Sequence, residues 1–222
     1  MKFSDILRYG IWAAVAATAN ANRREYHMQT TWLPHLATNT LTLLLPDAVR
    51  VLIPRGKEPK DIVGQVIVRM VRDNDNYVVY VVPLAAGYIL SHPRFNIFKG
   101  DWAEISFAGL RLDAIPHSAT GFALSAIVCD TLETASKLDT APGPFAKMVK
   151  NLSHHPALVS FGVLATLTFL WEYSEYNVHN HELALKGDIT KINMMWSADD
   201  TARDVIANML GWAAAMLLRR GR

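Results

Sequence analysis

The sequence predicts an all-α protein, a polytopic membrane helix bundle of about six transmembrane helices. Six apolar stretches alternate with charged or turn-rich loops along the 222 residues. The chain is 51% hydrophobic and 19% charged, yet its mean hydropathy is only +0.12, so the apolar residues are segregated into these stretches. A bilayer-spanning helix needs roughly 20 mostly apolar residues, and no strand-like alternation competes with this pattern.

Three apolar stretches lie in the N-terminal half. The first covers residues 6–20; its basic start and the small residues at 17–19 also resemble a cleavable signal peptide, but we expect it to remain as a first helix. The second covers 32–53, and Pro46 should bend it. The third covers 77–90. The first and third are short and need flanking polar residues to complete a span.

The C-terminal half contains the other three stretches, at about 106–132, 155–176 and 200–218. All three are long enough to cross a bilayer. The segment 61–72 is ambiguous because its β-branched residues suit a strand. Beside a membrane we interpret it as an amphipathic interfacial helix or the lead-in to the third span. A short linker follows at 139–144.

The stretches form a single integral membrane domain, residues 1–222, with N-terminal helices in 1–105 and a site-bearing part in 106–222. Basic residues outside the helices favour one side by about two to one, which predicts cytoplasmic termini. Arg23 and Arg24 locally favour the opposite orientation. A single cysteine, Cys129, excludes an internal disulfide, and its apolar surroundings predict a buried thiol. The sequence contains no nucleic-acid-binding pattern.

Under this topology the last three helices each place a polar pair at the outer membrane face. The pairs are spaced i,i+4 or i,i+3, so each pair lies on one helix face. Ionisable groups at membrane depth usually face a bundle interior or a cavity, and clustered carboxylates need protons, cations or a metal. We therefore predict a site there. Its members are Asp113 and His117, Glu172 and Glu175, and Asp200 and Asp204, with Asn208 one turn deeper.

Simpler interpretations remain open for each pair. Asp199 and Asp200 could cap the sixth helix, since Ser197-Ala-Asp-Asp200 resembles a capping box. Glu172 and Glu175 could simply lie at a solvated helix end in the membrane interface, where aromatic side chains gather. His117 could be a satisfied interior histidine. Beyond the fifth helix, His179 and His181 could add ligands, but a solvated loop is the simpler interpretation.

The same residues resemble a known family. Asp113-Ala-Ile-Pro-His117 followed by Gly121-Phe122, and Glu172-Tyr-Ser-Glu175, are similar to motifs of YjdF-like inner-membrane proteins, which are loosely VanZ-like. Further matches are Gly187-Asp188, Trp196, Asp200-Thr-Ala-Arg-Asp204, Asn208 and Gly211. The sequence departs from the family pattern at Tyr176, a position where the pattern has tryptophan. The resemblance covers about half the chain, and implies a six-helix bacterial membrane protein, without a settled reaction.

Two classes of function remain. The first is a site that binds or acts on a lipid-linked envelope substrate, with Glu172 or Glu175 as general base alongside His117. In that case Asp113, His117, Asp200 and Asp204 would suit a divalent metal: Mg²⁺ or Mn²⁺, or Zn²⁺ if the histidine ligates directly. The second is a non-enzymatic membrane protein, in which the acids form a proton or ion pathway or serve assembly. No nucleophile motif or nucleotide-binding glycine pattern is present.

Overall fold

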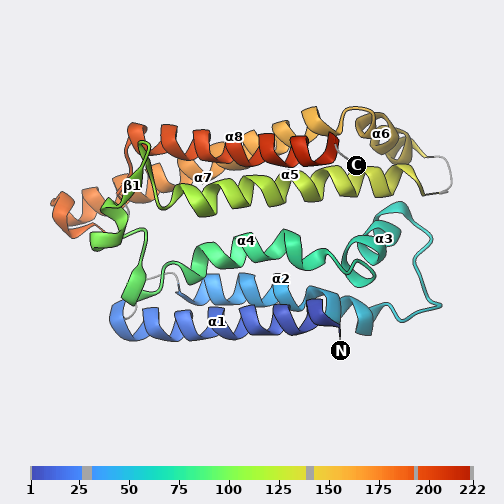
Figure 1. The fold of residues 1–222 in the computed structure, drawn as a ribbon, viewed down its shortest axis with the longest axis horizontal. Coiled ribbons are helices and arrows are strands. Elements are labelled where there is room, and N and C mark those ends of the chain that lie inside the picture. Colours follow the sequence, from blue (N-terminus) through green and yellow to red (C-terminus); the bar gives the residue numbers. More distant parts are fainter. Residues whose placement is uncertain (1, 27–31, 139–142, 193–194, 221–222) are drawn as a thin grey trace.

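A computed structural model describes the chain except for residues 1, 27–31, 139–142, 193–194 and 221–222 (Figure 1). The fold is all-α, as predicted: the protein is 80% helical, and the described residues form eight α-helices. Six of these are long and run roughly along one axis, in two three-helix groups. They correspond to the six apolar stretches of the sequence.

The N-terminal group consists of α1 (Phe3–Tyr26), α2 (Trp32–Leu52) and α4 (Tyr77–Ile89). Apolar side chains from all three helices form one buried cluster, which includes Val15, Leu43 and Val81. Pro46 lies inside α2, as the sequence predicts. The Tyr77 hydroxyl donates to the Thr42 carbonyl oxygen at 2.8 Å and so ties α4 to α2.

The C-terminal group consists of α5 (Ala114–Ser136), α7 (Pro156–Lys186) and α8 (Ala198–Arg220). It adjoins the N-terminal group through α4 and α5. A polar bridge crosses this junction: the Tyr80 hydroxyl donates to Asp130, and Arg219 forms ion pairs with Asp130 and with Glu133, the latter at 2.8 Å. One residue from α4, two from α5 and one from α8 are thereby linked.

The two ends of the bundle differ in their short elements (Figure 1). Both termini lie toward the same end, together with α3 (Ile62–Ile67), the π-helical turn η2 (Val68–Arg72) and α6 (Pro144–Ser153). The opposite end carries a two-stranded antiparallel hairpin, β1 (Ser106–Phe107) and β2 (Leu110–Arg111). Three 3-10 turns complete the connections, η3 (Pro93–Phe95), η4 (Gly100–Glu104) and η5 (Ile189–Lys191).

Several predicted boundaries were wrong. The fourth helix begins at Ala114 and not near residue 106, because the hairpin β1–β2 occupies 106–111. The helix α6 was not predicted; most of the expected linker before it, 139–142, falls outside the described residues. The fifth helix continues to Lys186, so His179 and His181 lie in α7 and not in a loop. The ambiguous segment 61–72 is helical, as predicted.

Membrane character is visible most clearly in one helix. Among the described helices only α7 is long and apolar enough to cross a membrane by length and composition, and α4 is a shorter apolar helix. Within α7 the only buried side chains are Ser160, Leu164 and Glu172. Its apolar surface is therefore exposed to the surroundings, as Leu158 and Phe169 illustrate with 70% and 67% exposure. This is weak support for membrane association.

Candidate functional site

Helices α5 and α8 approach each other at two glycines. A Cβ atom on Gly121 would overlap the Asn208 carbonyl oxygen, and one on Gly211 would overlap the Ser118 carbonyl oxygen and lie 2.7 Å from the Phe122 nitrogen. Side chains at either position would thus collide with the backbone of the partner helix. Small residues let helix backbones approach closely in membrane proteins.

Small buried residues extend this contact along both helices. On α5, Gly121 is followed at four-residue intervals by Ser125 and Cys129, and all three are buried. On α8 the corresponding series is Ala207, Gly211 and Ala215, also buried. The predicted burial of Cys129 is confirmed, since its exposure is 0%. The two helices therefore pack along a continuous strip of small side chains, which fixes their relative position.

This packing brings a predicted histidine and a predicted aspartate together. His117 lies one turn before Gly121 on α5, and Asp204 lies two turns before Gly211 on α8. The His117 Nε2 atom is 3.3 Å from the Asp204 Oδ2 atom. The side chain of Asp204 is only 10% exposed and that of His117 only 21%. The pair is thus a close acid–histidine contact, largely shielded from solvent and held by the helix crossing.

Helix α7, the remaining long helix of the C-terminal group, contributes Glu172, which is 8% exposed. Its Oε2 atom accepts a hydrogen bond from the Thr201 hydroxyl at 2.5 Å. Both glutamates of α7, Glu172 and Glu175, lie close enough to Asp204 to interact with it electrostatically. One turn deeper, the Asn208 amide donates to the Thr168 hydroxyl at 3.2 Å, so the polar contact between α7 and α8 continues inward.

The remaining two aspartates of the predicted site lie where α5 and α8 begin. Asp113 directly precedes α5 and Asp200 lies in the first turn of α8. Burial raises the pKa of the Asp113 carboxyl above its ordinary value, and the negative charge of Asp200 raises it further. The six predicted side chains thus converge from three neighbouring helices at the end of the bundle opposite the termini.

Two arginines offset part of this negative charge. Arg203 forms ion pairs with Asp199 at 2.6 Å and with Asp200 at 3.1 Å, and Arg111 lies 3.9 Å from Asp200. Sequence analysis missed these cations and Thr201. A signal was available, because Thr201 and Arg203 fall between Asp200 and Asp204 on one helical turn. Arg111 lies on the hairpin that was expected to be helix.

The simpler interpretations have different outcomes for different residues. The Ser197 hydroxyl accepts a hydrogen bond from the Asp200 nitrogen at 3.2 Å, so Ser197 caps α8. Asp199 is 83% exposed and pairs with Arg203, which leaves it outside the cluster. Glu172 is buried, so it does not belong to a wetted helix end. His179 lies within α7, where its Nδ1 atom accepts a hydrogen bond from the Trp196 nitrogen at 3.2 Å.

Chemically, the cluster can bind and exchange protons and can accept hydrogen bonds. The described residues include no group of three or more His, Cys, Asp or Glu side chains arranged to hold a metal ion. The predicted Mg²⁺, Mn²⁺ or Zn²⁺ site stays a prediction from the sequence. A histidine next to a buried carboxylate is instead suited to acid–base chemistry.

The glycine of the Gly187-Asp188 motif has a local explanation. Gly187 ends α7 in the left-handed conformation, with φ of 64°, and its nitrogen donates to the Leu183 carbonyl oxygen at 2.8 Å. A glycine is favoured at this position because other residues adopt positive φ at a cost. The turn that follows returns the chain toward α8.

Comparison of the chain with protein-family models, curated proteins and solved structures found no significant match. The resemblance to YjdF-like and VanZ-like proteins therefore stays a prediction from the motifs.

Proposed function

We propose that this chain is a multi-pass membrane protein of about six spans whose α5–α7–α8 end binds, or acts on, the head group of a lipid-linked envelope substrate. The observation that carries the site is the buried contact of His117 with Asp204, 3.3 Å apart, beside the glycine crossing of α5 and α8. Buried ionisable groups are costly and are a common mark of function in membrane helices. The termini would lie in the cytoplasm and the site at the outer face.

Exposed apolar surface supports the membrane part of this proposal. Large apolar side chains on α7 and α8 are exposed, including Leu170 at 53% and Leu217 at 66%. Large apolar side chains exposed in this number are unfavourable in water. At the end that carries the termini, the short helix α6 exposes Phe145 and Met148 next to Lys147 and Lys150. Basic and apolar side chains together are typical of a helix lying in the membrane interface.

The charge of the site limits the chemistry of the group it can hold. Five carboxylates face one histidine and two arginines, so a bare phosphate would be repelled. Hydroxyl or amine groups, as in a sugar or an amino-bearing head group, would instead be accepted as hydrogen-bond donors. We therefore propose that the glycan or amine portion of the lipid enters the site. Glu172 or Glu175 would serve as the general base and His117 as its partner.

A second candidate function is a proton or cation pathway. It is supported by polar contacts that continue from the site into the bundle. The Asn208 amide donates to Thr168, and farther along the same two helices the Trp212 indole nitrogen donates to the Ser160 hydroxyl at 3.2 Å. Such inward series of polar groups are typical of proton relays in membrane proteins.

Lipid retention tests the first candidate. The wild-type protein and the variants Asp204→Asn, Glu172→Gln and Asp199→Asn would be purified in a mild detergent, and the bound lipids identified by mass spectrometry. We expect the wild type and Asp199→Asn to retain a glycan- or amine-bearing lipid and the other two variants to lose it. All four should accumulate equally in the membrane, because neutralising a carboxylate in an acidic cluster relieves repulsion.

Two outcomes would contradict the proposal. If Asp204→Asn and Glu172→Gln fail to accumulate, the acids are packing elements and not a site. If both variants retain the same lipids as the wild type, the site does not hold the head group. Proton flux into liposomes containing the purified protein then tests the pathway, which requires that Asp204→Asn abolish the flux and Asp199→Asn preserve it.

A further inference from the structure

A cavity of about 440 Å³ lies at the other end of the protein, among the start of α1, the end of α2 and the turn η2. Pockets that hold small molecules usually measure about 300–1,000 Å³. Both termini lie toward this end of the bundle (Figure 1). Charged side chains make up the whole lining: Lys2, Asp5, Arg50, Arg55, Arg72 and Asp73.

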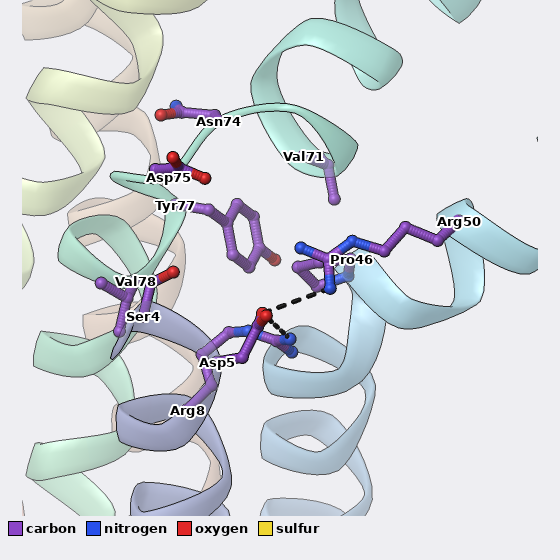
Figure 2. A pocket seen from close by; sticks show the side chains of 10 residues that line it. All are labelled: Ser4, Asp5, Arg8, Pro46, Arg50, Val71, Asn74, Asp75, Tyr77 and Val78. Atoms are coloured by element: carbon purple, nitrogen blue, oxygen red, sulfur yellow. Dashed lines mark hydrogen bonds and ion pairs between the residues drawn. The ribbon is translucent and has the colours of Figure 1, made fainter. Parts of the chain in front are cut away.

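One wall of the cavity adjoins an ion-pair cluster between α1 and α2. Figure 2, a view of a smaller neighbouring pocket, shows Asp5 of this cluster paired with Arg8 and Arg50. Arg8 is only 2% exposed and forms ion pairs with Asp5 and Asp47, both at 2.9 Å. Arg50 forms ion pairs with the same two carboxylates, at 3.2 Å and 3.1 Å, and uses only its Nη1 atom for both. Its other nitrogens form no hydrogen bond or ion pair with the residues that the structure describes, and so can donate to a ligand from a side chain already held in position.

The opposite wall is fixed by Arg72. Its guanidinium donates to Asp73 and to the Ile53 carbonyl oxygen, in each case at 2.9 Å, and to Glu58 at 3.0 Å. These contacts tie η2 to the loop that follows α2. Arg55 lies in that loop, is exposed, and forms no hydrogen bond or ion pair with any residue that the structure describes. The loop is thus anchored, while its arginine is unpaired beside the cavity.

The lining itself carries four basic side chains and two carboxylates, and neighbouring carboxylates offset most of this excess. Lys2 pairs with Asp75, Arg50 pairs with Asp5 and Asp47, and Arg72 pairs with Asp73 and Glu58. Among the lining cations, Arg55 alone has no carboxylate partner in the described part of the chain. The pKa of Asp73 is held below its ordinary value by the hydrogen bond from Arg72, against the opposing effect of burial, and the charges of Arg72, Arg55 and Arg50 lower it further. An anion entering here would meet two arginines with unused donors.

We propose that this cavity binds a phosphate group, with Arg55 and Arg50 as its principal donors. The guanidinium group matches phosphate oxygens with paired hydrogen bonds, which favours phosphate over a simple halide. The phosphate could belong to the head group of an anionic membrane lipid or to a soluble phosphate compound. Basic pockets between helices at a membrane surface are a known mode of anionic lipid recognition. The site is distinct from the acidic cluster, which lies at the far end of the bundle.

Thermal unfolding of the full-length protein in a neutral detergent tests the proposal, because a ligand that binds the folded state raises the unfolding midpoint. One arm compares potassium phosphate with potassium chloride at equal ionic strength, so that screening is matched. The other compares mixed micelles containing phosphatidylglycerol with micelles containing phosphatidylcholine. The variants are Arg55→Gln, Arg55→Lys and, as a matched control, Arg69→Gln, an exposed arginine on η2 outside the cavity lining.

We expect the wild type and Arg69→Gln to be stabilised, and Arg55→Gln to bind about tenfold or more weakly, since one charge-assisted contact is lost. Arg55→Lys should recover part of the affinity. Stabilisation by phosphatidylglycerol alone assigns the site to a lipid, whereas stabilisation by phosphate ions assigns it to a soluble phosphate group. The proposal is overturned if neither arm stabilises the wild type, or if Arg55→Gln responds as strongly as Arg69→Gln.

Discussion

The substitution Gly211→Ala tests the helix crossing that positions the site. The added Cβ would overlap the Ser118 carbonyl oxygen and lie 2.7 Å from the Phe122 nitrogen and 2.9 Å from the Ser118 carbonyl carbon. All three atoms belong to backbone, so no rotamer change relieves the contact. Because non-bonded heavy atoms prefer a separation of about 3.5 Å, the two helices must move apart by roughly 1–1.5 Å.

Overpacking of this kind costs about 1–3 kcal/mol, against a gain of up to about 1 kcal/mol in helix propensity from glycine to alanine. The propensity gain is shared by a control glycine in another helix, so we expect Gly211→Ala to be about 1–3 kcal/mol less stable than that control, with a lower unfolding midpoint in detergent. Gly162→Ala is the matched control, because a Cβ at that helical glycine meets no atom within 4 Å. The reasoning is refuted if Gly211→Ala is as stable as Gly162→Ala.

Two further perturbations test other parts of the structure. Arg8→Ala leaves the carboxylates of Asp5 and Asp47 without their buried partner, so we expect a loss of about 3–5 kcal/mol in unfolding experiments, with little effect from the exposed control Arg24→Ala. Asp113 has a raised pKa in the folded state, so its ionisation destabilises the fold as pH rises above the ordinary value of 3.8. Asp113→Asn should therefore match the wild-type midpoint below that pH and exceed it at pH 7; an equal difference at both pH values contradicts the assignment.

The long helices could be predicted because their apolar stretches are long and are separated by polar loops. The errors arose where local signals are weak. The apolar residues of 106–112 were merged with the next helix, since a two-residue strand pair leaves no periodic pattern. The end of α7 was placed too early, because the polar residues after Tyr176 lower the hydropathy without ending the helix; the structural end is Gly187.

The site was predictable as a set of pairs but not as a set of contacts. Helical spacing placed each pair on one face, and a common topology placed all three pairs at one end. Which atoms meet depends on the depth of helix packing, which Gly121 and Gly211 determine. The hydrogen bond from Thr201 to Glu172 joins residues 29 positions apart and could not be inferred from spacing.

The proposed function requires that a membrane separate the two ends of the bundle. Cys129 is the only cysteine and is buried, so Cys129→Ala gives a background for single-cysteine labelling. In intact cells, a membrane-impermeant maleimide should label Glu104→Cys and Met195→Cys, which lie toward the site end. It should label Lys57→Cys and Lys147→Cys only after the membrane is opened. Labelling of all four positions alike in intact cells, or recovery of the protein in the soluble fraction, would contradict the account.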